Sequence, residues 1–221
     1  MARSKIIDLR KLLAERFPQE IVSPANQLAT GITHLDSALN GGLTKGAITE
    51  LISPPGKGGS ASLIAALLQR AAGERYFLAL IDGCDSFDPQ SSAPAALRHL
   101  LWIRCHQTSE AMQAADLLLR DGNFPLLILD LVLHPIAELR RIPSSNWYRL
   151  QRLIEPSSSA LLAFTPCSLI SSAQWKLILE NRWRLPQLDG VTTELQRQLR
   201  VHLQRAQPNR WQSNPALASV G

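Results

Sequence analysis

Short segments that consist almost entirely of apolar residues alternate along this chain with segments of helical spacing. The apolar segments predict strands at residues 47–52, 76–81, 100–104, 126–131 and 160–164. Between them, apolar residues recur three and four positions apart, which predicts helices at residues 60–72, 109–120 and 147–154. Strands without polar alternation, separated by helices, are typical of a parallel sheet that helices cover on both faces. We therefore expect an α/β fold.

Local signals mark the ends of the helix at residues 109–120. Ser109 is the expected N-cap, because a serine hydroxyl can accept a hydrogen bond from a free N–H group of the first turn. Gly122 stands just past the other end, where a left-handed residue commonly ends a helix.

The N-terminal segment has the pattern of an amphipathic helix at residues 4–17, ended by Pro18. Its apolar positions share one side and are Ile6, Leu9, Leu12 and Leu13. Such a face either covers the chain's own core or docks on a partner.

The C-terminal part has a different character. Residues 172–180 predict a helix, and residues 182–188 and 197–204 predict a β-hairpin in which Leu199, Val201 and Leu203 form the buried face. The Pro-, Asn- and Ser-rich end predicts disorder. These patterns divide the chain into an arm at residues 1–29, a core at residues 30–206 and a tail at residues 207–221.

A strand, a Gly/Pro-rich turn and a helix form the frame of a phosphate-binding loop, and residues 53–60 stand at that position as S-P-P-G-K-G-G-S. Gly58 and Ser60 match the G-x-x-x-x-G-K-[ST] pattern, whereas Ser53 replaces its first glycine and Gly59 replaces its lysine. The lysine neutralises charge that develops on transferring phosphates, and glycine supplies neither charge nor reach. Lys57 lies two positions before that slot. By itself the segment fits a plain glycine-rich strand-to-helix connection better than a phosphate-binding loop.

Longer stretches on either side resemble RecA recombinases. Residues 30–46, T-G-I-T-H-L-D-S-A-L-N-G-G-L-T-K-G, resemble the run that leads into the RecA phosphate loop, and residues 81–89, I-D-G-C-D-S-F-D-P, resemble RecA's I-D-A-E-x-x-x-D-P. The resemblance covers roughly residues 30–205. It implies a RecA-like three-layer core with a mostly parallel sheet, a leading N-terminal helix and a C-terminal β-hairpin.

The resemblance also assigns roles to single positions. RecA activates the attacking water with a glutamate of the second stretch, and Cys84 occupies that slot; Asp85 is adjacent, but a shift of one residue at a strand end turns a side chain the other way. Asp130 matches a magnesium-associated carboxylate of the family. Little room remains at residues 130–160 and 166–172 for the mobile loops with which RecA binds DNA.

A shortened RecA-like core with altered nucleotide motifs and a leading helix resembles the ImuA family. Residues 46–51 and 100–104 are similar to segments of that family. The resemblance implies an accessory protein of damage-induced translesion DNA synthesis that binds RecA and/or translesion polymerase subunits, among them an inactive Y-family polymerase relative. It implies no enzymatic activity and neither ATP nor magnesium as a cofactor. RecA docks its own N-terminal helix on a neighbouring subunit, which favours docking for the leading helix here.

Two other functions stay open. The first is an ATP-binding or weakly hydrolysing protein, because Gly58, Ser60 and Asp130 are retained and Lys57 is close to the missing lysine. The second is a DNA-binding module, because arginines interleaved with tryptophans suit phosphate contacts and base stacking. Those arginines are Arg182, Arg184, Arg197, Arg200 and Arg205, with Trp175, Trp183 and Trp211 among them.

Composition sets broad limits. The net charge of +5 favours anionic partners such as nucleic acid, and the 45% of hydrophobic residues suffices for a sizeable core. The three cysteines are expected to be buried and reduced, and the five histidines to lie on the surface or at strand ends without metal spacing. No signal peptide or membrane span is indicated, so a cytoplasmic, nucleoid-associated protein is expected. Self-association is left open.

Overall fold

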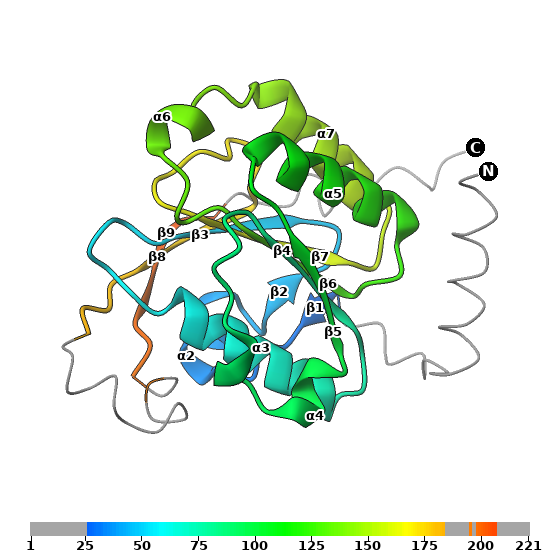
Figure 1. Cartoon of the computed structure of the whole chain (residues 1–221), viewed down its shortest axis with the longest axis vertical. Helices are drawn as coiled ribbons and strands as arrows, with labels where there is room; N and C mark the ends of the chain where they lie inside the picture. Colours follow the sequence, from blue (N-terminus) through cyan, green and yellow to red (C-terminus); the bar gives the residue numbers. More distant parts are fainter. Residues whose placement is uncertain (1–25, 184–194, 196–197, 207–221) are drawn as a thin grey trace, which may run out of the picture.

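The computed structural model of the protein describes residues 26–183, 195 and 198–206 (Figure 1), and for Arg205 and Ala206 it describes the backbone alone. The strands are β1 Gln27–Leu28, β2 Leu43–Thr44, β3 Ile48–Ile52, β4 Leu78–Asp82, β5 Leu100–Arg104, β6 Leu126–Asp130, β7 Ala160–Thr165, β8 Trp175–Leu179 and β9 Val201–Ala206. The α-helices are α2 Thr33–Ala38, α3 Ser60–Gly73, α4 Pro94–Leu97, α5 Thr108–Asp121, α6 Ile136–Leu139 and α7 Ser144–Ile154, and a short 3-10 helix, η1, spans Pro89–Ser91.

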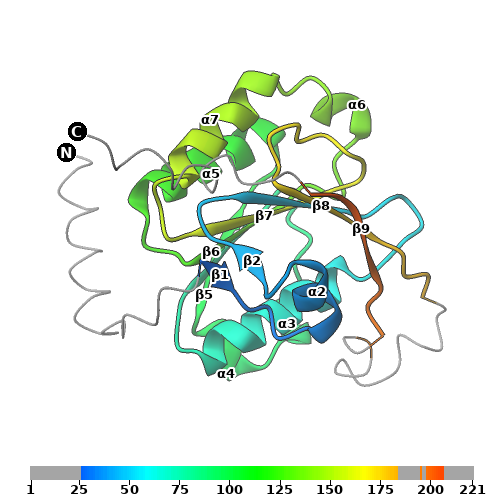
Figure 2. The same ribbon diagram turned by 180° about the vertical axis from the view of Figure 1, so that it is seen from behind.

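Seven strands form one sheet in the order β5-β4-β6-β7-β3-β8-β9. The neighbouring pairs are parallel except for β8 and β9, which run antiparallel. Helices α5, α6 and α7 cover one face, while α2, α3, α4 and the small β1–β2 pair lie on the other (Figures 1 and 2). The expected three-layer α/β core with a mostly parallel sheet is therefore confirmed.

The central strands are apolar on both sides because both faces of the sheet are covered. All residues of β3, β4 and β7 are buried, and β6 is buried up to Asp130. One apolar cluster joins the sheet to α5 and α7, and a second joins it to α2 and α3. Because β3, β4, β6 and β7 run parallel, their carboxyl ends lie at one edge of the sheet, where ligand sites of such folds lie.

Helix α5 begins one residue earlier than expected. Its N-cap is Gln107 rather than Ser109, and the Glu110 carboxylate accepts hydrogen bonds from the N–H groups of His106 (2.9 Å) and Gln107 (3.2 Å). This reciprocal capping satisfies free donors of the first turn better than a lone serine would. The other end is as expected, since Gly122 ends the helix with a φ of 69°.

The expectation of a helix at residues 172–180 is wrong, since Trp175–Leu179 form strand β8 beside β3. Without β8, one side of the buried strand β3 would keep unpaired N–H and C=O groups, so tertiary context overrides the local helical pattern. A C-terminal antiparallel pair exists and consists of β8 and β9. Leu199 is buried as expected, whereas Leu203 is 38% exposed.

Several expected features lie outside the described residues. They are the helix at residues 4–17 with its apolar face, most of the segment 182–188, and the tail at residues 207–221. No helix within the described ranges is long and apolar enough to cross a membrane.

A buried ion pair joins β8 to the centre of the sheet. Glu50 on β3 is fully buried, and its Oε2 lies 2.8 Å from Nζ of Lys176, its cross-strand neighbour on β8. Oε1 of Glu50 accepts hydrogen bonds from the N–H groups of Leu169 (2.7 Å) and Ile170 (3.1 Å) and from the Thr165 hydroxyl (3.1 Å). One carboxylate therefore fixes both β8 and the loop that follows β7.

Replacing Lys176 with methionine should destabilise the protein by about 3–5 kcal/mol, because the Glu50 carboxylate would stay buried without its counter-charge. The free energy of unfolding in urea, followed by tryptophan fluorescence, measures this. Arg120→Met is the matched control: it breaks an exposed pair with Asp116 and should cost less than about 1 kcal/mol. Equal effects of the two substitutions would contradict the central role of the Glu50–Lys176 pair.

Candidate functional site

The loop between β3 and α3 occupies the position where nucleotide phosphates bind in folds of this kind. It runs from Ser53 to Gly59 at the carboxyl end of a central strand and leads directly into the N-terminus of α3. Free N–H groups and the helix dipole make such a position favourable for anions. Whether the loop can bind phosphate depends on what its N–H groups already contact.

Most of the loop's N–H groups already have partners within the protein. Ser53 donates to the Thr165 carbonyl (2.8 Å), Lys57 to the Pro54 carbonyl (2.9 Å) and Gly58 to the Asn181 carbonyl (2.9 Å). Residues 54 and 55 are prolines and have no N–H group. Among the described residues, the loop from 53 to 59 thus keeps only the N–H groups of Gly56 and Gly59 for another acceptor.

Two apolar side chains pack directly on the glycines of the loop. A Cβ atom on Gly58 would lie 2.7 Å from Cδ1 of Trp183, and a Cβ atom on Gly59 would lie 2.8 Å from Cδ2 of Leu199. Gly59 also has a φ of 117°, which residues with a side chain rarely adopt. A lysine at position 59 would therefore meet both an unfavourable backbone and occupied space.

The residues that cover the loop are held by the Asn181 side chain, which is buried. Its Nδ2 donates to the Gln198 carbonyl (2.7 Å), and its Oδ1 accepts from the Arg200 N–H group (2.6 Å). Asn181 therefore links the segment that follows β8 to the segment that precedes β9. We call residues 180–183 together with Leu199 the loop cover.

Lys57 does not take the position of the missing lysine. Its Nζ donates to the carbonyl of Glu180 (3.1 Å), so its charge lies against the loop cover. Gly58 and Ser60 keep their expected positions at the end of the loop and the start of α3. In this arrangement the loop cover packs on the two glycines that directly precede α3.

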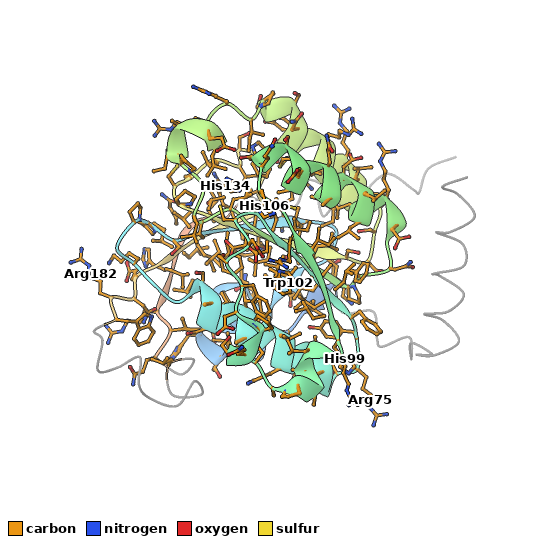
Figure 3. The ribbon with its side chains drawn as sticks, viewed as in Figure 1. Arg75, His99, Trp102, His106, His134 and Arg182 are labelled. Atoms are coloured by element: carbon orange, nitrogen blue, oxygen red, sulfur yellow. The ribbon has the colours of Figure 1, made fainter. Side chains whose placement is uncertain are left out.

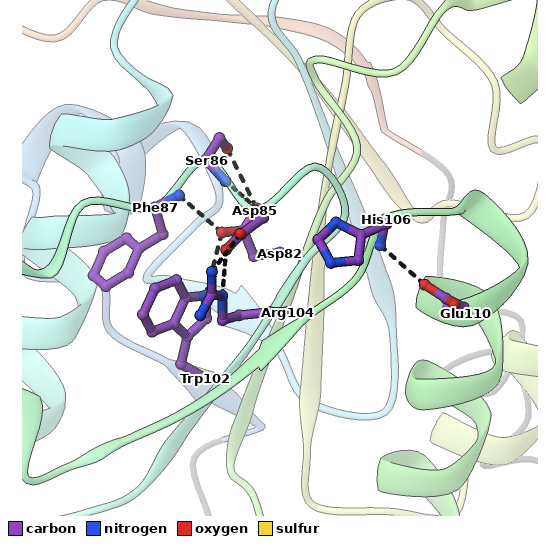
Figure 4. Close-up of polar contacts among 8 residues, drawn as sticks. All are labelled: Asp82, Asp85, Ser86, Phe87, Trp102, Arg104, His106 and Glu110. Carbon is purple, nitrogen blue, oxygen red and sulfur yellow. Dashed lines mark hydrogen bonds and ion pairs between the residues drawn. The ribbon is translucent and has the colours of Figure 1, made fainter.

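The slot of the catalytic glutamate lies beside a well-ordered acidic turn after β4 (Figure 4). Asp82 is buried and accepts hydrogen bonds from the N–H groups of Ser86 (2.9 Å) and Phe87 (2.8 Å) and from Nε1 of Trp102 (3.2 Å). Asp85 forms an ion pair with Arg104 on the edge strand β5. The Asp85 carboxylate is thus directed to the outer strand, as expected from its one-residue offset.

Cys84 and Asp130 lie close together at the ends of β4 and β6. Burial, with the Asp130 and Asp82 carboxylates nearby, raises the pKa of the Cys84 thiol above its ordinary value. Such a thiol is a poor nucleophile at neutral pH. Burial also raises the pKa of Asp130 to about 6, although its Oδ1 accepts a hydrogen bond from the Val132 N–H group (3.1 Å).

His134 lies in the protein interior, contrary to the expectation of a surface or strand-end residue. It is 5% exposed, and its ring lies against Gly83, where a Cβ atom would be 2.7 Å from Nε2 (Figure 3). Its Nδ1 lies 3.4 Å from the Thr108 hydroxyl, which also bonds to the Glu138 carboxylate.

The three cysteines also differ from the expectation that all are buried. Cys105 is buried, but Cys84 and Cys167 are partly exposed. Within the described ranges no group of three or more potential ligands could hold a metal ion.

The structure brings together two of the five arginines expected to bind DNA. Arg182 and Arg200 line a cavity of about 740 Å³ with Trp183 and His34, and Arg182 is directed outward (Figure 3). Arg184 and Arg197 lie outside the described residues, and for Arg205 the backbone alone is described.

Sequence reasoning missed the residues that close the loop. Asn181 carries no motif, and Trp183 was assigned only to a DNA-binding surface or the core. One signal was present: a lysine replaced by glycine leaves room beside the loop, which another side chain must fill in a well-packed protein.

Fold and sequence together define a RecA-like α/β protein. The chain is similar to the RecA proteins of Acinetobacter baylyi (32% identity over 131 residues, 56% of this chain and 37% of that protein) and Mycobacteroides abscessus (31% over 131 residues). It is also similar to the RecA protein of Streptomyces venezuelae, with 29% identity over 168 residues, 73% of this chain and 43% of that protein. The chain thus spans less than half the length of these curated relatives. No protein-family model matches it.

Restoring the lysine of the phosphate loop should destabilise the protein instead of creating a nucleotide site. We expect Gly59→Lys to lower the free energy of unfolding by about 1–3 kcal/mol, because of the positive φ and the contact with Leu199. Urea unfolding measures this. Gly73→Ala is the control, since its Cβ would meet nothing within 4 Å, and it should be neutral or stabilise by up to about 1 kcal/mol. A stable Gly59→Lys protein would show that the loop cover is not fixed.

Asp130 should make stability depend on pH. Its pKa is raised on folding, so its contribution favours the folded state below pH 4 and is lost as pH rises through about 6. Asp130→Asn stays neutral and keeps an acceptor for Val132. The difference in unfolding free energy between Asp130→Asn and wild type should therefore shift in favour of the variant by about 2–3 kcal/mol from pH 4.5 to pH 7.5. Urea unfolding at both pH values tests this, and parallel pH profiles of the two proteins would refute it.

Proposed function

We propose that this protein is a non-catalytic RecA-like adaptor in bacterial DNA-damage tolerance. It would bind RecA and/or translesion polymerase subunits, as the resemblance to ImuA proteins implies. The observation that carries the proposal is the loop cover: Asn181 accepts the N–H group of Gly58, and Trp183 and Leu199 pack on Gly58 and Gly59. In this RecA-like core, the chain's own loop cover packs on the phosphate loop. Such a core is suited to bind partner proteins through its surface.

Three changed positions support the absence of catalysis. Gly59 offers no charge at the lysine position, Cys84 offers no carboxylate at the glutamate position, and Ser53 replaces the first glycine. Each change alone would remove several kcal/mol of transition-state stabilisation, on the order of 3 kcal/mol for one electrostatic contact. Neither ATP nor magnesium is part of the proposal.

The N-terminal segment is the proposed docking element. Its apolar residues, Ile6, Leu9, Leu12 and Leu13, would pack on a neighbouring protein, as the apolar face of an amphipathic helix does in other complexes. The proposal places the protein in the cytoplasm with the nucleoid. Weak, salt-sensitive contacts with DNA through Arg182 and Arg200 are compatible with this role.

One observation favours a second candidate, a protein that binds ATP or hydrolyses it slowly. Gly58 and Ser60 keep the end of the loop, and Asp130 lies at the end of β6 as in RecA. This candidate requires that the loop cover open.

The deciding experiment mixes the purified protein with RecA of the same bacterium and measures association by size-exclusion chromatography with light scattering. We expect a complex that is lost on deletion of residues 1–20 and on joint replacement of Ile6, Leu9 and Leu13 by serine. Joint replacement of Lys11 and Glu15 by serine, on other sides of the predicted helix, is the control.

ATP hydrolysis is followed in parallel. The adaptor proposal expects no release of phosphate above background. Turnover that Gly58→Ala or Asp130→Asn abolishes would refute the proposal and support the second candidate. Absence of any complex with RecA would direct the same measurement to the polymerase subunits, and failure there too would refute the adaptor role.

A further inference from the structure

A groove of about 780 Å³ lies on the face of the molecule that α5, α6 and α7 cover, remote in the fold from the loop cover. Helices α5 and α7 lie side by side there (Figures 1 and 2), and Arg141, Ile142 and Pro143, between α6 and α7, contribute to the lining. Apolar side chains of Met112, Leu117, Ile142 and Leu150 line it. The groove has the size of pockets that bind peptides and small ligands.

Leu117 gives the groove an exposed apolar side chain. It is 59% exposed, on the outer side of α5, whereas Met112 on the same helix is buried. An exposed leucine alone means little, but one that borders a groove of apolar side chains marks a surface where a partner gains affinity.

Around the groove, the charged side chains without a partner among the described residues are mainly arginines. Arg149 and Asp116 neutralise each other through two hydrogen bonds (2.6 and 3.1 Å), and Glu138 bonds to Thr108. Arg141 also lines the groove, and its side chain makes no hydrogen bond or ion pair with any described residue. Arg152 lies one turn after Arg149 and is likewise exposed and unpaired in that part of the chain.

Charge disfavours the two terminal segments of the chain as occupants. Residues 1–25 carry five Lys or Arg against three Asp or Glu, and residues 207–221 carry one Arg and no acidic residue. Both would bring positive charge to a rim whose free groups are guanidinium groups. The complementary occupant has carboxylates on the flanks of an apolar face.

We propose that this groove binds an acidic amphipathic helix of a partner protein. Leucine-like side chains spaced three and four residues apart would contact Leu117, Ile142 and Met112, as in other helix-in-groove complexes. Glutamates or aspartates on the flanks would pair with Arg141 and Arg152, since arginine binds carboxylates in a bidentate manner. The surface deepens the proposed adaptor role by naming the chemistry of one partner contact.

A nucleic acid fits the groove less well. Its apolar side chains are aliphatic instead of the aromatic platforms on which bases stack. The exposed aromatic residue of α7, Tyr148, does not line the groove.

The test uses a phage-displayed library of random 16-residue peptides selected on the full-length protein. Enriched peptides are synthesised with a fluorophore, and their affinity is measured by fluorescence polarisation. We expect them to combine leucine-type residues at helical spacing with an excess of acidic residues. A labelled 30-residue oligo(dT) is measured in the same way.

Two groove variants have matched controls elsewhere on the surface. Leu117→Lys should weaken peptide binding about tenfold or more, whereas Leu133→Lys, at a leucine that is 65% exposed outside the groove, should leave it within about twofold. Arg141→Glu should weaken it about fivefold, and the exposed Arg98→Glu should not. All four positions lie at the surface, and circular dichroism checks that each variant folds.

The outcomes separate cleanly. Acidic, leucine-containing peptides that lose affinity with Leu117→Lys and not with Leu133→Lys support the proposal. Peptides that are basic, or that bind Leu117→Lys as well as wild type, refute it, as does oligo(dT) binding that both groove variants abolish. Leu117→Lys is also run with RecA by size-exclusion chromatography. If Leu117→Lys keeps the complex with RecA but loses peptide binding, or loses the complex but keeps peptide binding, the groove and the proposed docking of residues 1–20 are separate sites.

Discussion

The buried carboxylate of Glu50 fixes the part of the fold on which the proposed function depends. It pairs with Lys176 and thereby joins β8 to the central strand β3, and it accepts N–H groups from the loop after β7. Strand β8 leads directly into Glu180 and Asn181, which bond to the phosphate loop. A charge pair in the sheet therefore determines what covers the loop several residues away. Buried pairs of this kind stabilise little by themselves, but breaking one leaves an isolated charge, so they specify geometry strongly.

The loop between β3 and α3 is held by contacts within the chain. Glycine at position 59 leaves space beside the loop that a longer side chain would fill. Here the carbonyl groups of Glu180 and Asn181 accept from Nζ of Lys57 and from the N–H group of Gly58, and Trp183 and Leu199 pack on the two glycines. The loop conformation is thus preserved by protein contacts. The RecA-like backbone is compatible with the changed residues because donors of the loop bond to carbonyl groups of the chain.

The parallel sheet could be predicted because its central strands are apolar on both sides, a pattern that few other structures produce. The element at residues 175–179 could not, since its pairing with β3 depends on Glu50, which lies more than a hundred residues earlier. At the site, the replaced residues Gly59 and Cys84 are visible in the sequence, as is the offset of Asp85. The loop cover is not, because Asn181 and Leu199 belong to separate segments that only the folded chain brings together. His134 was misassigned for the same reason, since its burial depends on packing against Gly83 and α5.

The bond between Asn181 and Gly58 has a consequence for how such a protein would respond to the cell. The occupancy of a nucleotide site rises and falls with the concentration of the nucleotide. A group tethered on the same chain has a fixed effective concentration, commonly in the millimolar range or above for short connections. Dilution, starvation or competition from other nucleotide-binding proteins does not change it. In the proposed adaptor, which would not hydrolyse nucleotide, the timing of its action would come from the proteins that bind it.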